Sequence, residues 1–184
     1  MPQVRKPGLY SLGAVLVVGA LLWGCNGTDI DDPTTSDSLL VVQSVNPASV
    51  QADVSPTTDP NTLLSQPPKD DTVAVKVSNV FRGEGTGGTF TDVFISSVDI
   101  ACANGSLQLA GSTSGIPTSL TVPANTTGDI VVLLAPGPYK SANAGALLAI
   151  GTDTCRVTFM GNDLGGEPVQ STDAVVHLSY VDTP

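Results

Sequence analysis

Few side chains in this 184-residue sequence have the reactivity that catalysis or metal binding needs: three cysteines, one histidine and scattered carboxylates. The cysteines, Cys25, Cys102 and Cys155, include no C-x-x-C pair, which weakens a redox or metal role. A Ser-His-Asp relay would have to use His177, and no G-x-S-x-G turn presents a nucleophile. We therefore expect no catalytic residue, no metal site and no cofactor, and we interpret His177 as a solvent-facing strand residue.

Cys25 follows an apolar segment near the start of the chain. Arg5 and Lys6 give this segment a positive beginning, and residues 9–23 contain no charged side chain. About fifteen residues suits the apolar core of an export signal, whereas a membrane-spanning helix needs roughly twenty. We expect residues 1–24 to be a signal peptide that is cut before Cys25. The alternatives are an uncleaved membrane anchor and an ordinary secretory signal cut after another small residue.

The junction Leu22-Trp23-Gly24-Cys25 resembles the lipobox of bacterial lipoproteins, in which Gly or Ala directly precedes the cysteine. Leu22, Gly24 and Cys25 match that pattern, and Trp23 departs from it because a small or branched residue is usual there. The resemblance implies a diacylglyceryl group on the Cys25 sulfur, cleavage before Cys25 and acylation of the new amine. Each buried acyl CH₂ contributes about 0.8 kcal/mol and one chain binds only marginally, so two or three chains would hold the protein stably on a lipid bilayer.

The chain that remains after cleavage is acidic. Removing residues 1–24 leaves 5 basic and 17 acidic side chains, a net charge of −12. Affinity for nucleic acid comes mainly from Lys and Arg contacts with phosphate, so this charge argues against a nucleic-acid partner. The acidic residues are scattered along the sequence, and that distribution favours solubility over a dedicated acidic site.

The sequence after Cys25 divides into a short polar segment and one domain. Residues 25–38 comprise the lipidated cysteine and an acidic run with nothing to bury, which predicts a flexible tether. Residues 39–184 are rich in Gly, Pro, Thr, Ser and Val, which favours short strands and turns and argues against helices. We predict an all-β sandwich of about seven strands. The strand-like runs are residues 39–45, 72–82, 91–101, 119–122, 129–135, 154–160 and 174–181.

Three other stretches lack a strand pattern. The four prolines of residues 54–71 predict a long surface loop, because proline lacks the N–H group that a central strand donates to its neighbour. The glycines of residues 83–88 fit a G-x-G-x-x-G string, but a strand-like run follows it and Glu84 would repel phosphate, so we predict a hairpin loop. Residues 136–150 are rich in Gly and Ala, and we assign them no conformation.

Alternation along the strands predicts which side chains face the core. Val73, Val75 and Val77 share one face of their run, and the last run shows the same pattern with Val176, Leu178 and Tyr180 pointing inward.

The same period of two aligns Cys102 with Phe94, Val98 and Ile100, and Cys155 with Val157 and Phe159, so both sulfurs are expected to face the core. In an exported protein two inward cysteines are expected to pair. Closing a loop of about 54 residues would stabilise the fold by roughly 4 kcal/mol. We therefore predict a disulfide between Cys102 and Cys155.

Residues 119–135 and 155–180 resemble a group of uncharacterised bacterial lipoproteins with a single immunoglobulin-like (Ig-like) β-sandwich. The group has the phrase V-T-F-x-G-x-D-x-x-G-x-x-V in its last hairpin, and seven residues here match it. The resemblance implies an Ig-like antiparallel sandwich and a lipid anchor, and it implies no ligand. The matching residues are Val157, Thr158, Phe159, Gly161, Asp163, Gly166 and Val169.

These observations favour a non-catalytic protein on the cell envelope that works in adhesion, scaffolding or envelope assembly. An envelope protein or a surface polymer would dock on the loops at residues 54–71, 83–88 and 136–145. In proteobacterial lipoproteins an Asp directly after the acylated cysteine tends to retain the protein at the inner membrane; Asn26 stands here, which favours the outer membrane. The alternative function is a calcium-dependent binder or a hydrolase that uses acidic loop residues. These residues are Asp92, Asp99, Asp153, Asp163 and Glu167.

Overall fold

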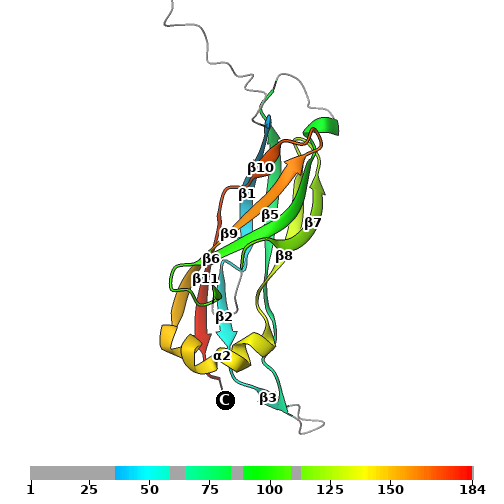
Figure 1. The fold of residues 1–184 in the computed structure, drawn as a ribbon. Coiled ribbons are helices and arrows are strands. Elements are labelled where there is room, and N and C mark those ends of the chain that lie inside the picture. The colour runs from blue at the N-terminus through cyan, green and yellow to red at the C-terminus, as the bar shows by residue number, and fades with distance from the viewer. Residues whose placement is uncertain (1–35, 59–64, 84–88, 109–112, 184) are drawn as a thin grey trace, which may run out of the picture. The chain divides into compact units, whose positions relative to one another are not determined.

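The structure is a computed structural model that describes residues 36–58, 65–83, 89–108 and 113–183. The predicted signal peptide, Cys25 and all but the end of the predicted tether lie outside these residues, as do parts of the loops at 54–71 and 83–88. The described residues are mostly strands, which agrees with the predicted all-β class (Figure 1).

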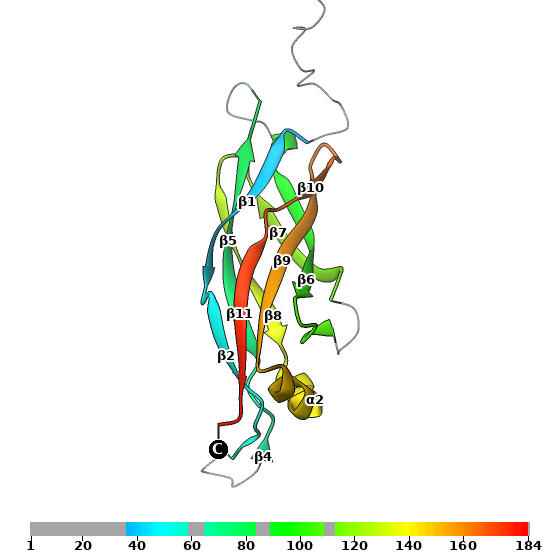
Figure 2. The same ribbon diagram turned by 90° about the vertical axis from the view of Figure 1, so that its left-hand side faces the viewer.

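Two sheets make up most of the domain, and all but one of their strand pairs are antiparallel. The first has the order β1-β5-β8 and the second the order β2-β11-β9-β6-β7, with β10 beside β9 (Figure 2). A two-stranded hairpin of β3 and β4 is separate from both. The bounds are β1 Ser38–Asn46, β2 Ser49–Asp53, β3 Thr57–Thr58, β4 Ser65–Gln66, β5 Asp71–Phe81, β6 Val93–Cys102, β7 Ile116–Val122, β8 Thr127–Ala135, β9 Thr152–Asp163, β10 Pro168–Gln170 and β11 Ala174–Val181, together with the 3₁₀ helix η1 Thr89–Thr91 and the helix α2 Gly137–Ile150.

The N-terminal segment of the domain contributes to both sheets. β1 pairs antiparallel with β5, and after the cis peptide bond before Pro47 the chain continues as β2, which pairs parallel with β11. The strand-like runs in the sequence predicted β1 but did not include β2, because only Val50 and Ala52 of this short strand face the core.

The core lies between the two sheets, and the predicted alternation is confirmed. Val73, Val75 and Val77 of β5 are buried while Lys76 between them is exposed. Val176, Leu178 and Tyr180 of β11 are buried in the same way. Each such side chain stabilises the fold by about 1.5 to 3 kcal/mol relative to an exposed position, so the alternating runs supply most of the driving force for folding.

One predicted core residue is wrong. Phe94 of β6 is 39% exposed, and its neighbour Ile95 is fully buried instead. A bulge at Ser96 shifts the register of β6 against both β7 and β9. One extra residue in a strand moves the following side chains to the other face, so Val98 and Ile100 face the core as predicted while Phe94, before the bulge, does not.

The helix α2 also differs from the expectation that the domain contains no helix. Pro136 and Pro138 fix the backbone at its start, four alanines favour the helical state, and Gly151 ends it with a positive φ of 71°, which glycine adopts readily. Only Gly137, Lys140 and Leu147 of this helix are buried. α2 lies at the end of the sheets where the C-terminus also lies (Figure 1).

Candidate functional site

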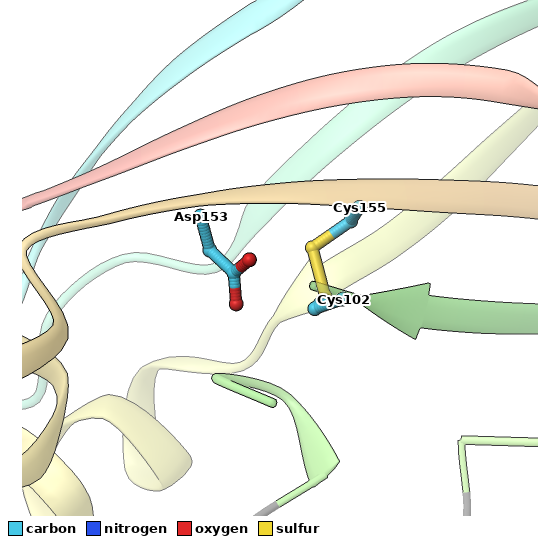
Figure 3. A group of neighbouring side chains, drawn as sticks. All are labelled: Cys102, Asp153 and Cys155. Atoms are coloured by element: carbon cyan, nitrogen blue, oxygen red, sulfur yellow. A yellow bond between two sulfur atoms is a disulfide. The ribbon is translucent and has the colours of Figure 1, made fainter. Parts of the chain in front are cut away.

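The predicted disulfide is present and joins two strands of the second sheet. Cys102 is the last residue of β6 and is directly opposite Cys155 of β9, with the two Cα atoms 3.9 Å apart. Cys155 is fully buried and Cys102 is half-buried. Because these strands are neighbours in the sheet, the bond fixes the end of β6 against the beginning of β9. Figure 3 shows that Asp153 extends from β9 on the same side as Cys155.

Asp153 is a buried carboxylate, only 4% exposed. Its Oδ1 accepts the backbone N–H of Asn104 at 2.8 Å and that of Thr154 at 2.7 Å, and its Oδ2 accepts the N–H of Ser106 at 3.0 Å. Burial by itself favours the neutral acid, but the three N–H groups outweigh it and hold the pKa of Asp153 below its ordinary value. Asp153 is thus an ionised group that fixes the turn after β6.

Two tyrosines pack behind this turn. The Tyr139 hydroxyl of α2 donates a hydrogen bond to the carbonyl oxygen of Ser106, and burial raises the Tyr139 pKa. Tyr180 of β11 is 5% exposed, and burial raises its pKa to about 12. We call Cys102, Asn104, Ser106, Asp153 and Cys155 the disulfide corner. The two tyrosines connect it to α2 and to the last strand.

A polar pocket of about 360 Å³ opens beside the disulfide corner. Asp153 and His177 both line it, together with Asn104, Thr152, Thr154 and Ser179. His177 is exposed, as predicted, and its Nδ1 lies 3.1 Å from the Thr154 hydroxyl. In the register of β9 and β11, His177 is opposite Thr154 while Asp153 is opposite Leu178, so the imidazole and the Asp153 carboxylate lie on opposite faces of the sheet. This arrangement differs from an acid-imidazole relay, in which the carboxylate orients the imidazole.

Of the other acidic residues proposed for calcium binding or hydrolysis, Asp163 and Glu167 share one turn, Asp92 lies beside that turn, and Asp99 lies in β6. Asp92 accepts the N–H of Ala124, and Asp99 accepts the N–H of Gly115. Asp163 accepts the N–H of Glu167 at 2.9 Å and the hydroxyl of Ser36 at 2.7 Å. Over the described ranges, one group of three potential ligand side chains converges, namely Cys102, Asp153 and Cys155, and the two sulfurs of that group are bonded to each other.

A second pocket contains residues that the sequence patterns did not single out. It has a volume of about 290 Å³ and is lined by Gln51, Asp53, Asp71 and Lys140, with Pro68 and Lys69. Lys140 is 1% exposed, and its Nζ lies 2.5 Å from Oδ2 of Asp71. In the sequence, Lys140 is a single lysine inside a Gly- and Ala-rich segment. Its burial could not be predicted, because it depends on that segment forming a helix.

Two of the predicted docking loops contact each other. The loop before β5 and the first turn of α2 meet at Gly137, whose N–H donates to Asp70 at 2.7 Å. A Cβ atom at Gly137 would lie 1.7 Å from the carbonyl oxygen of Pro68, so glycine is required for this close approach. Residues 59–64 and 84–88 of the predicted docking loops lie outside the described residues.

A third pocket is apolar and lies at the open side between β7 and β8. Its volume is about 250 Å³. The two strands are close at Gly128, where a Cβ atom would lie 2.8 Å from the side chain of Leu120, and the pocket lies further along β8. It is lined by Ile100, Leu107, Thr113, Ile116, Leu133, Leu134, Pro136 and Tyr139.

Comparisons with known proteins do not assign this chain to a family. No protein-family model matches the sequence, and no curated protein is significantly similar to it. Within the described part of the chain, no helix combines the length and the apolar character needed to cross a membrane.

Proposed function

We propose that this chain is a lipid-anchored protein of the cell envelope, held at the outer membrane by acylated Cys25, and that its Ig-like domain binds an envelope protein without catalysing a reaction. The sequence supports the anchor through Arg5, Lys6, the apolar residues 9–23 and the match of Leu22, Gly24 and Cys25 to the lipobox. Cys25 precedes Ser36 by 11 residues, a span of at most about 38 Å, so the domain would work close to the bilayer.

The strand order supports the Ig-like assignment. In an Ig-like sandwich one sheet contains strands A, B and E, and the other contains C, F and G, with C′ added in variable-type domains. The order β1-β5-β8 corresponds to A-B-E, and β7-β6-β9-β11 corresponds to C′-C-F-G. The disulfide departs from the antibody pattern, because it joins two strands within one sheet instead of bridging the sheets.

The observation that carries the binding role is the edge of β8. In the described residues, β8 pairs with β5 on one side and with no strand on the other. Val131 and Leu133 of this strand are 70% and 46% exposed. A free edge offers backbone N–H and C=O groups to an extended segment of another protein.

The apolar pocket adds specificity to this edge. Leu133 and Leu134 of β8 line it, so a segment that pairs with β8 would have an apolar side chain within reach of the pocket. In strand addition the main chain supplies affinity and such pockets select side chains. The partner we propose is therefore an envelope protein with an exposed, extended segment that contains at least one large apolar residue.

Anchoring is tested by metabolic labelling with a palmitate analogue in cells that express the full chain. We expect label on the wild-type protein and none on Cys25→Ser. Equal labelling of both, or none on either, would contradict the anchor.

Binding at the β8 edge is tested with a photo-crosslinking amino acid at Val131 in the full chain. The matched control is Val175 of β11, a valine with 44% exposure that lies on the other sheet. We expect a discrete crosslinked envelope protein from position 131 and none from position 175. The same products from both positions, or no product from position 131, would rule out β8 as the binding edge.

A further inference from the structure

The buried lysine of α2 has an unusual environment. Lys140 is 1% exposed, and over the described residues its Nζ has one hydrogen-bond partner, Oδ2 of Asp71. A lysine ammonium group has three N–H donors. A buried ammonium group has little access to water, so Lys140 depends on Asp71 in this position.

Its partner is also a poor site for a charge. The Asp71 side chain is 14% exposed. Burial raises the pKa of Asp71 above its ordinary value, and the opposing effect of Lys140 does not cancel this increase. The site therefore favours the neutral acid form of Asp71, and the hydrogen bond from Nζ to Oδ2 is a direct path for one proton between the two groups.

The surrounding backbone holds the two groups in reacting distance. Asp71 is the first residue of β5, and Lys140 lies in the first turn of α2. The close approach of Gly137 to Pro68, and the hydrogen bond from the Gly137 N–H to Asp70, fix that turn against the residues before β5. Nζ lies 2.5 Å from Oδ2, and groups held in such contact react with effective concentrations far above those reached in solution.

We propose that Lys140 and Asp71 are joined by an amide bond between Nζ and Cγ. The Nζ lone pair adds to Cγ of the Asp71 carboxylic acid, one proton passes from the nitrogen to a carboxyl oxygen, and that oxygen leaves as water. No oxidant, reductant or external reactant is needed. Asp53 lines the same pocket, and its carboxylate can carry the proton from nitrogen to oxygen.

The product fits the site better than the ion pair does. An amide has one N–H donor, and its formation removes two ionisable groups from a buried position. A comparison pair joins β5 to β8: Lys76 Nζ and Asp129 Oδ1 are 3.9 Å apart, with side chains 47% and 69% exposed. Water solvates both of those charges, so we expect no amide there.

The bond is tested by mass spectrometry of the full chain after reduction, alkylation and digestion with trypsin. Trypsin does not cleave after an acylated lysine, so we expect residues 70–76 joined to residues 83–156, lighter than the two separate peptides by one water molecule. The control is Lys140→Arg, in which trypsin cleaves at position 140 and residues 70–76 are released free. Release of free 70–76 and 83–140 in full yield from the wild-type chain would overturn the proposal.

The role of Asp53 is tested in the same digest. We expect Asp53→Asn to leave a fraction of the chains unlinked soon after synthesis, because the proton carrier is lost. Complete linkage at the earliest time point would remove Asp53 from the reaction.

Discussion

Two Lys-Asp pairs each have one residue on β5, Asp71 and Lys76, five positions apart, and the two pairs differ in burial. Asp71 pairs with Lys140 in a closed site, whereas Lys76 pairs with Asp129 on the solvent face of the first sheet. The exposed pair exchanges water contacts for a weak attraction, so it contributes little to the free energy of unfolding. The buried pair has lost its water, so each group depends on the other. The same two residue types therefore have different roles, because α2 buries one pair and the other pair is exposed to water.

The largest effect is expected from removing each lysine in turn. Lys140→Met leaves the Asp71 carboxyl without its partner and should lower the free energy of unfolding by about 3 kcal/mol or more. Lys76→Met should change it by less than about 0.5 kcal/mol. Urea denaturation of the two variants measures the difference. Equal effects would show that burial does not distinguish the pairs.

A second test addresses the packing that buries Lys140. Gly137→Ala places a Cβ atom against the Pro68 carbonyl oxygen and should destabilise the fold by about 2 kcal/mol, because the first turn of α2 must move away. Gly145→Ala on the same helix meets no atom within 4 Å and should stabilise it by about 0.8 kcal/mol through helix propensity. Thermal unfolding measures whether each substitution raises or lowers the stability of the fold. A stabilised Gly137→Ala variant would mean that α2 does not contact Pro68 closely.

The third test extends the comparison to a carboxylate held by backbone N–H groups instead of a lysine. Asp153→Asn replaces one acceptor oxygen by a donor and should cost about 2 kcal/mol at pH 7. Because the folded-state pKa of Asp153 is lowered, its contribution is complete above the unfolded-state value of about 3.9 and is lost as the pH falls through the folded-state value.

The stability difference between wild type and Asp153→Asn should therefore shrink on acidification, which urea denaturation at several pH values would reveal. Asp129→Asn is the control, since its side chain is 69% exposed and should matter little at either pH. A difference for Asp153→Asn that stays constant from neutral to strongly acidic pH would contradict the proposed role of the three N–H groups.

The strands and the disulfide could be predicted because their signals are local. Alternating apolar residues in β5 and β11 identify the buried face, and Cys102 and Cys155 lie close to or within predicted strands. Phe94 was placed on the wrong face because a bulge at Ser96 has no distinctive residue type. The missed strand β2 exposes every second residue and is too short to give a pattern.

The Lys140 site could not be predicted because it depends on contacts between distant segments. Asp71 and Lys140 are 69 residues apart, and nothing in either neighbourhood indicates the other. α2 itself has few bulky residues, so its helical state follows from prolines, alanines and a terminal glycine instead of from apolar periodicity. The acidic residues were candidates by type alone, and in the structure Asp92, Asp99 and Asp163 each accept a backbone N–H group.

We propose that a lipid on Cys25 holds this domain beside a membrane, and this lipid would be found on the N-terminal tryptic peptide of the protein from the membrane fraction. We expect a peptide of residues 25–69 that carries the added mass of a diacylglyceryl group and an amide-linked acyl chain. A peptide that begins within residues 1–24, or an unmodified Cys25, would contradict it.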